Sequence, residues 1–186
     1  MKQSGKRRHI FLTGFMGAGK SRIGKSLAEQ YNYTLYDSDE LIEETAGKAI
    51  KNIFEEDGED QFRIIESKVI KKLCLLKEPA VISLGGGAIQ NDKNFEMVEK
   101  YGISVYIASS PEAILNRVKH TSKRPLLNVA KGKNYEARLL ARITELLNKR
   151  IPTYEKADIV INRDGLELEE IVKQMYIKIQ QYRKDM

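Results

Sequence analysis

Five short apolar runs alternate with segments of helical periodicity along the chain. The runs are HIFLT (9–13), YTLY (33–36), AVISL (80–84), ISVYIA (103–108) and DIVIN (158–162). After the first run, Ile23, Leu27 and Tyr31 recur every four positions, which is the spacing of one helix face. Strands that alternate with helices predict an α/β fold, in which helices flank both faces of a five-stranded parallel sheet.

Later segments continue the helical pattern, and no internal repeat or low-complexity linker divides the chain. They predict buried helix faces at Ile64, Ile65, Val69, Ile70 and Leu73, and at Ile171, Val172, Met175 and Ile179. We therefore expect a single domain over residues 1–186.

Two stretches depart from the simple alternation. Residues 38–76 contain several helical pieces, punctuated by two glycines, before the next strand begins. Residues 119–135 are basic and contain glycine and proline, as an exposed excursion would. Second substrates and mobile covers commonly lie over the carboxyl ends of parallel strands. We therefore expect a substrate-binding region at about 38–66 and a lid at about 117–135.

The composition is that of a globular protein, with 186 residues, 41% hydrophobic and 31% charged. No apolar stretch is long enough to span a bilayer, and the basic start lacks the apolar segment of a signal peptide. The single cysteine, Cys74, excludes an internal disulfide and lies in an apolar helical stretch, where a buried structural thiol is the better interpretation. We expect a cytoplasmic protein with no membrane partner.

The formal net charge of +6 raises the question of a nucleic-acid partner. Much of this charge comes from Lys2, Lys6, Arg7 and Arg8, which we expect to form a solvated arm. The other basic residues lie beside acidic ones, and no basic stripe carries interleaved aromatic residues. The sequence therefore disfavours nucleic-acid binding.

The segment GFMGAGKS, residues 14–21, follows the first apolar run and matches the phosphate-loop pattern G-x-x-x-x-G-K-[ST]. Its glycines let backbone N–H groups turn toward phosphates, and the following helix adds its positive N-terminal end. In such a loop Lys20 reaches the β- and γ-phosphates and the Ser21 hydroxyl ligates Mg²⁺. A chance glycine-rich turn would not explain the strand before it and the helix after it. The loop alone does not separate a kinase from a GTPase switch or an ATPase.

An acidic pair, Asp37 and Asp39, stands at the end of the second apolar run. Residues two apart on an extended segment point the same way, so both carboxylates could face the phosphate loop. One could hold Mg²⁺ through water, and the other could orient an acceptor hydroxyl for in-line attack. The alternative is helix capping, with Ser38 or Asp39 at the N-cap of the next helix.

Two further features point to a ligand beside the nucleotide. Arg63 has Glu66 one helical turn later, which makes either a surface ion pair or an arginine oriented to grip a substrate carboxylate. Gly85, Gly86 and Gly87 end a buried strand, where three glycines cost backbone entropy and fill no core. A tight turn needs one glycine, so close approach of a ligand to the backbone is the better explanation.

These motifs together resemble the shikimate kinase family, P-loop enzymes of the nucleoside monophosphate kinase-like fold. The resemblance rests on GFMGAGKS, DSD, IFEEDGEDQFR with a glutamate three residues later, VISLGGG, RPLL and KRIPTYEKAD, in this order over nearly the whole chain. It implies transfer of the ATP γ-phosphate to the 3-hydroxyl of shikimate, giving shikimate 3-phosphate and ADP in chorismate and aromatic amino-acid biosynthesis. It also implies one Mg²⁺ ion bound with ATP, small-molecule substrates only, and a monomer.

The resemblance assigns roles residue by residue. Catalysis would involve Lys20 on the phosphates, Asp39 at the shikimate hydroxyls, and Arg124 of RPLL in the closing lid. Ser21 would ligate Mg²⁺, and Asp37 would support the ion through water. The residues implied to bind ATP are Gly14, Gly17, Ala18, Gly19, Lys20, Ser21, Arg22, Arg117, Arg124 and Arg163. The residues implied to bind shikimate are Asp39, Arg63, Gly85, Gly86, Gly87 and Arg150.

Some of these assignments depend on position in the pattern. Arg117 is placed like an adenine-stacking arginine, and Arg163 falls near the adenine loop of the family. Arg22 stands where the family often has threonine, and the segment between RPLL and KRIPTY is longer than in compact members. Without the motifs, Arg150 could simply complement a helix C-terminus and Arg124 could be a solvated lid charge.

Without the family, the residues describe a kinase for a small hydroxylated acid. Three alternatives remain open: a kinase of the same fold for gluconate or a nucleoside monophosphate, a P-loop switch or non-catalytic relative, and nucleic-acid binding through the basic arm. The glycine triplet and the Asp-x-Asp pair argue against the first. The sequence contains no Asn-Lys-x-Asp element of the kind that reads guanine.

Overall fold

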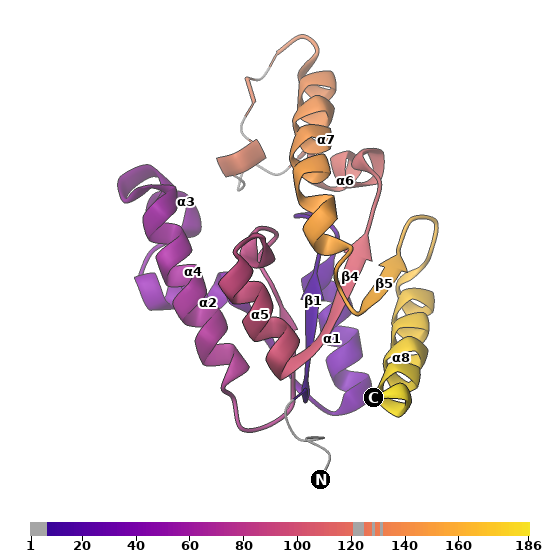
Figure 1. The fold of residues 1–186 in the computed structure, drawn as a ribbon. Helices are drawn as coiled ribbons and strands as arrows, with labels where there is room; N and C mark the ends of the chain where they lie inside the picture. The colour runs from indigo at the N-terminus through magenta and orange to yellow at the C-terminus, as the bar shows by residue number, and fades with distance from the viewer. Residues whose placement is uncertain (1–6, 121–124, 128, 131) are drawn as a thin grey trace.

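The computed structural model is a three-layer α/β fold (Figure 1) and describes residues 7–120, 125–127, 129–130 and 132–186. Five parallel strands form one sheet in the order β2-β3-β1-β4-β5. Their bounds are β1 His9–Thr13, β2 Thr34–Asp37, β3 Ala80–Ser83, β4 Gly102–Ala108 and β5 Ile159–Asn162. Each strand lies within one residue of an apolar run in the sequence, so the prediction of a five-stranded parallel sheet is confirmed.

Helices cover both faces of the sheet. Their bounds are α1 Lys20–Tyr31, α2 Ser38–Ala46, α3 Ile50–Glu56, α4 Gly58–Cys74, α5 Asp92–Tyr101, α6 Pro111–Val118, α7 Tyr135–Tyr154 and α8 Leu168–Asp185, with 3₁₀ turns η1 Ala88–Gln90 and η2 Pro125–Leu127. The helices α1 and α8 pack on one face and α4, α5 and α7 lie over the other. Among the described residues, no helix is both long and apolar enough to cross a membrane.

The central strand β1 contributes side chains to the hydrophobic clusters on both faces of the sheet. Phe11 packs with the cluster under α4 and α5, whereas Ile10 and Leu12 pack with the cluster under α1 and α8. Successive side chains of a strand point to opposite faces, so a continuous apolar run fits a strand that is buried on both sides. The strand therefore runs through the middle of the molecule and holds the phosphate loop at its carboxyl end.

Two details differ from the sequence-based expectations. Ile64 is 49% exposed, although it was expected on the buried face of its helix. The buried face of α4 follows Phe62, Glu66 and Val69, and a residue two positions after Phe62 lies about 200° around the helix, on the opposite side. A polar residue, Glu66, is therefore buried on this face of α4, whereas Ile64 lies on the exposed side.

The end of the basic arm is anchored and not solvated as expected. Arg7 forms an ion pair with Asp158 at 2.5 Å and donates to Tyr182 at 2.9 Å, and Arg8 donates to the Leu76 carbonyl at 2.5 Å. The expectations for Lys2 and Lys6 lie outside the described residues. Cys74 is fully buried, as expected, and burial raises the pKa of its thiol to about 12, so it stays protonated.

Candidate active site

The carboxyl ends of β1, β2 and β3 bring three distant segments to one edge of the sheet. In the strand register Leu12 pairs with Ser83, and Ser83 pairs with Asp37. The segments that follow these residues are the phosphate loop, the acidic pair and the glycine triplet. Open parallel sheets bind ligands at this edge, so the fold collects the candidate residues where a ligand is expected.

The phosphate loop links β1 to α1 and has the backbone conformation that its glycines allow. Gly17 and Gly19 have φ values of 81° and 87°, in the left-handed region that favours glycine. Gly19 is the N-cap of α1, and no side chain caps the helix there. The first N–H groups of α1 are therefore available to an anion, with the positive end of the helix behind them.

The Lys20 side chain lies within the phosphate loop, as expected. Its side chain is 91% buried, and Nζ donates to the carbonyls of Gly14 at 2.9 Å and Phe15 at 3.2 Å. These two carbonyls hold the amine at the mouth of the loop. A phosphate bound there would offer the amine a stronger, charged acceptor than a carbonyl.

The acidic pair meets the phosphate loop through a serine. Ser21 Oγ donates to Asp37 Oδ2 at 2.5 Å, and Asp37 Oδ1 accepts from the backbone N–H of Asp39 at 3.0 Å. Asp37 is thus the N-cap of α2, a position that the capping alternative gave to Ser38 or Asp39. Because α2 begins at Ser38, the extended geometry expected for this segment is wrong. Asp39 instead lies in the first turn of α2.

The glycine triplet is lined on three sides by the protein itself. A Cβ on Gly85 would lie 2.6 Å from Asp39 Oδ1, one on Gly86 would lie 3.0 Å from the Met16 backbone nitrogen, and one on Gly87 would lie 2.7 Å from an Arg63 nitrogen. No other residue fits without moving these groups. The triplet thus lets an acid, the phosphate loop and an arginine approach one short stretch of backbone.

Arg63 is held by two carboxylates on its own helix. Its guanidinium donates to Glu66 at 2.7 Å and to Glu59 at 2.9 Å, and it lies 5.0 Å from the Phe62 ring centroid. Although burial acts to lower the pKa of Arg63, Glu66 and Glu59 raise it. Burial raises the pKa of Glu66, which is 1% exposed, despite the opposing charge of Arg63.

Arg150 approaches the triplet from the other side, on α7. Its NH1 donates to the Gly86 carbonyl at 3.1 Å, its guanidinium lies 5.4 Å from the Phe15 ring centroid, and its side chain is 7% exposed. The Tyr154 hydroxyl, one helical turn later, donates to the same carbonyl. Arg150 is therefore directed at the glycine triplet and lines the cavity, and its role in binding a substrate stays a prediction.

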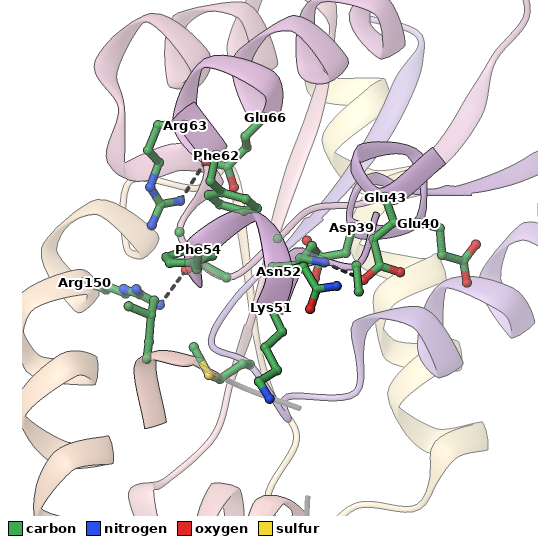
Figure 2. Close-up of a pocket in the computed structure, with 17 residues that line it drawn as sticks. Asp39, Glu40, Glu43, Lys51, Asn52, Phe54, Phe62, Arg63, Glu66 and Arg150 are labelled. Atoms are coloured by element: carbon green, nitrogen blue, oxygen red, sulfur yellow. Dashed lines mark hydrogen bonds and ion pairs between the residues drawn. The ribbon is translucent and has the colours of Figure 1, made fainter. Parts of the chain in front are cut away.

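A cavity of about 630 Å³ lies between these groups. Figure 2 shows Arg63 and Arg150 on one side of it, Asp39 on the other, and the rings of Phe54 and Phe62 along the wall. Met16 of the phosphate loop and Leu126 of the lid segment also line the cavity. The charged lining consists of Arg63, Arg150 and Lys51 together with the carboxylates Asp39, Glu40, Glu43 and Glu66. Two neighbouring arginines beside carboxylates and an apolar wall suit a small hydroxylated acid.

The remaining arginines gather at the far side of the phosphate loop. Arg163 follows β5 and donates to the Ala18 carbonyl at 2.6 Å, and Arg117 on α6 donates to the Gly17 carbonyl at 3.2 Å. Arg22 is exposed on α1. Arg124 lies outside the described residues, so its expected place in the lid stays a prediction. Figure 1 shows α6 and the start of α7 standing beyond the carboxyl ends of the strands.

Comparisons with known proteins agree on one family. The family model described as shikimate kinase matches residues 16–180 of the chain. A shikimate kinase from Chlorobaculum parvum is 42% identical over 174 residues, which are 93% of this chain and 92% of that protein. The chain belongs to the shikimate kinase family.

Solved structures support the same family, because shikimate kinases match more closely than a kinase of another family. A shikimate kinase from Acinetobacter baumannii, in complex with shikimate, matches with a TM-score of 0.84, 35% identity and 94% of each chain covered. A gluconokinase from Sinorhizobium meliloti matches with a TM-score of 0.62 at 18% identity, which shows a shared fold alone.

The structure adds residues that sequence reasoning about the shikimate kinase motifs did not single out. The rings of Phe54 and Phe62 pack at a tilt of 40° with centroids 4.7 Å apart, and both line the cavity. Tyr154 could have been found from its spacing, since it lies four residues after Arg150 on one helix face. Asp164, which accepts from the Ser110 N–H and lies 3.6 Å from Arg117, carried no signal in the sequence, because both partners are distant in the chain.

Proposed function

We propose that the protein is a shikimate kinase that transfers the γ-phosphate of ATP to the 3-hydroxyl of shikimate, giving shikimate 3-phosphate and ADP in chorismate and aromatic amino-acid biosynthesis. One observation carries the proposal. Asp39, the Arg150 guanidinium and Arg63 all reach three consecutive glycines, next to a phosphate loop. Consecutive Cα atoms are about 3.8 Å apart, so the acid and both arginines fall within the span of one small ligand.

Arg63 and Arg150 bind the shikimate carboxylate in this proposal. Both guanidinium groups border the cavity, and a planar guanidinium matches a carboxylate with two parallel hydrogen bonds. Glu59 and Glu66 fix the plane of Arg63 before the ligand arrives. The carboxylate thereby sets the direction in which the ring hydroxyls point.

Asp39 and Glu66 receive the hydroxyl groups. Glu66 Oε1 is buried without a hydrogen-bond partner among the described residues, and it borders the same cavity as Asp39. A buried acceptor without a donor costs about 1–3 kcal/mol, which a ligand hydroxyl would recover. Asp39 orients the reacting hydroxyl toward the γ-phosphate, and whether it also takes the proton is a separate test.

Lys20 and Mg²⁺ bind the phosphates. Ser21 Oγ and the Asp37 carboxylate place two hard oxygen donors 2.5 Å apart beside the loop, which fits an ion that prefers oxygen ligands and keeps several waters. Bound with ATP, Mg²⁺ would neutralise charge on the β- and γ-phosphates. Lys20 would exchange its loop carbonyls for phosphate oxygens, and the backbone of Gly14, Gly17, Ala18 and Gly19 would cradle them.

The other sequence-based expectations belong to the same proposal. Arg117 and Arg163 bind the adenine end of ATP, Arg22 borders the phosphates, and Arg124 closes over them with a lid at about 117–135 that excludes water. We also propose one domain over residues 1–186, a substrate-binding region at about 38–66, a monomer and a cytoplasmic location.

A coupled ADP-release assay tests the proposal. The purified protein is supplied with ATP and Mg²⁺ and with shikimate, gluconate, AMP or no acceptor. We expect turnover with shikimate alone. Turnover with AMP would leave the phosphate site in place but contradict binding of a carboxylate by Arg63 and Arg150. Turnover with gluconate would retain a carboxylate acceptor but contradict shikimate as the substrate, and no turnover despite ATP binding would indicate a non-catalytic relative.

A further inference from the structure

The turn after β5 carries a carboxylate that belongs to none of the assigned roles. Arg163 N–H donates to the Ala108 carbonyl at 3.1 Å, and Leu166 N–H donates back to the Arg163 carbonyl at 3.2 Å, which closes a tight turn. Gly165 takes the left-handed conformation with φ of 76°, and Asp164 N–H donates to Asn162 Oδ1 at 3.1 Å. Asp164 is thus held at the tip of a short, well-bonded turn.

Asp164 reaches across to the helix that carries Arg117. Its Oδ2 accepts from the backbone N–H of Ser110 at 2.6 Å, and its Oδ1 lies 3.6 Å from Arg117 NH2. Ser110 is the N-cap residue of α6, and Arg117 lies in the last turn of the same helix. One carboxylate therefore contacts both ends of α6.

The arginines around this carboxylate repel one another. Burial, Arg117 and Arg22 lower the pKa of Arg163, whereas Asp164 acts to raise it. The remaining partners of Arg117 are the Gly17 carbonyl at 3.2 Å and Ser109 Oγ at 3.3 Å, both neutral and both long. Without the carboxylate, Arg117 would lose its one charged contact among the described residues and would move away from Arg163.

We propose that Asp164 is a positioning residue for the nucleotide, whose carboxylate holds Arg117 beside the phosphate loop in the orientation that receives the base of ATP. The inference rests on the proposed function, since Arg117 is taken to bind the adenine end. Asp164 acts through Arg117 and does not itself touch the reacting groups. It should therefore affect nucleotide binding and leave acceptor binding unchanged.

An Asp164→Asn substitution separates the charge from the hydrogen bond, because the amide oxygen can still accept from Ser110 N–H. We expect the KM for ATP and the Kd for ADP to rise about five-fold, which is the size of a typical coupling between contacting groups, with the KM for shikimate unchanged. Asp92→Asn removes the same charge from an exposed helix start and should leave the three constants unchanged. An unchanged Kd for ADP in Asp164→Asn overturns the proposal.

A double-mutant cycle with Arg117→Ala tests the route of the effect. We expect Asp164→Asn to change the Kd for ADP by less than about two-fold once Arg117 is absent. The same five-fold effect in both backgrounds would show that Asp164 acts independently of Arg117, contrary to the proposal. If Asp164→Asn does not fold, Asp164→Glu carries the test, because the retained charge should keep the Kd for ADP closer to wild type than Arg117→Ala does.

Failure of the inference and failure of the proposed function have different signatures. ADP binding can be measured by calorimetry without an acceptor. A wild-type protein that binds ADP but does not phosphorylate shikimate overturns the function and leaves the role of Asp164 testable. A wild-type protein that phosphorylates shikimate, with an Asp164→Asn variant that binds ADP normally, overturns the inference alone.

Discussion

The cleft has an acceptor end, which contains Arg63 and Arg150, and a nucleotide end, which contains Arg117 and Arg163. The arginines at the two ends are held in different ways. At the acceptor end, Glu59 and Glu66 contact Arg63 and raise its pKa against the effect of burial. At the nucleotide end, burial and Arg117 lower the pKa of Arg163, and Asp164 only partly offsets them. One end is electrostatically balanced before a ligand arrives, and the other carries an excess of positive charge.

This difference matches the charges of the two proposed ligands. Shikimate brings one carboxylate, so a balanced clamp of fixed geometry gives specificity without strong attraction. ATP brings several negative charges, which an uncompensated group of arginines attracts and which relieve the repulsion among them. The comparison predicts that changes at the acceptor end act on shikimate and on chemistry, and changes at the nucleotide end act on ATP affinity.

The largest expected effect comes from Asp39, which lies between the two ends. Asp39→Asn keeps a hydrogen-bond acceptor of the same size but cannot take a proton. If Asp39 is a general base, kcat should fall by about 10²–10⁴-fold with little change in either KM. Initial rates under saturating substrates measure this. A near-normal kcat would remove the base role and leave Asp39 as a positioning group.

The next effect is specific to the acceptor end. Arg150→Ala should raise the KM for shikimate by about 10–10²-fold, the loss expected for a charged hydrogen bond of about 1.5–3 kcal/mol, and leave the KM for ATP unchanged. Lys149→Ala, the exposed neighbour on the same helix, is the matched control and should change neither constant. An equal rise in both KM values would mean that the two ends are not separate.

Ionic strength should change the KM for ATP more than the KM for shikimate, and this effect should be smaller than that of Arg150→Ala. Raising the ionic strength from about 0.05 to 0.5 M shortens the screening length several-fold, so the KM for ATP should rise a few-fold. The KM for shikimate should change less, because Arg63 is already paired with two carboxylates. Potassium acetate and potassium chloride should give the same trend. A larger salt effect on shikimate would reverse the comparison.

The smallest effect is a difference in pH dependence. The pKa of Glu66 is raised by burial, so on acidification it takes up a proton earlier than an ordinary glutamate and loosens Arg63. Asp164 accepts hydrogen bonds from Ser110 and lies near Arg117, and these contacts lower its pKa despite burial, so it keeps its charge to lower pH.

Between about pH 7 and pH 5 the KM for shikimate should therefore rise about two- to three-fold, while the Kd for ADP should follow the titration of ADP alone. Glu66→Gln removes the titrating group and should abolish the acid-side rise in the KM for shikimate. Persistence of that rise in Glu66→Gln would assign it to another group.

Much of the fold was predictable because its signals are local. Buried parallel strands such as residues 9–13 and 103–108 are continuous apolar runs, and the phosphate loop has a fixed pattern between a strand and a helix. The error at Ile64 arose because apolar content was counted without knowing which face of α4 meets the sheet. Glu66 lies on that face, where it forms an ion pair with Arg63 and borders the cavity.

The candidate site was predictable where residues within one motif cooperate, and not where the contacts span the chain. Arg63 and Glu66 are three residues apart, and their ion pair follows from helix geometry. Asp164 and Ser110 are 54 residues apart, and only the pairing of β4 with β5 brings them together. The prediction that a ligand explains the three glycines was incomplete, because Asp39 and Arg63 also require that space.

The most direct test of the account compares shikimate with its methyl ester as acceptors. The ester keeps every hydroxyl and removes only the negative charge that Arg63 and Arg150 are proposed to bind. We predict that kcat/KM for shikimate exceeds that for the ester by about 10²-fold or more, and that Arg150→Ala narrows the ratio. Equal kcat/KM values for the acid and the ester would contradict the carboxylate clamp and with it the choice of acceptor.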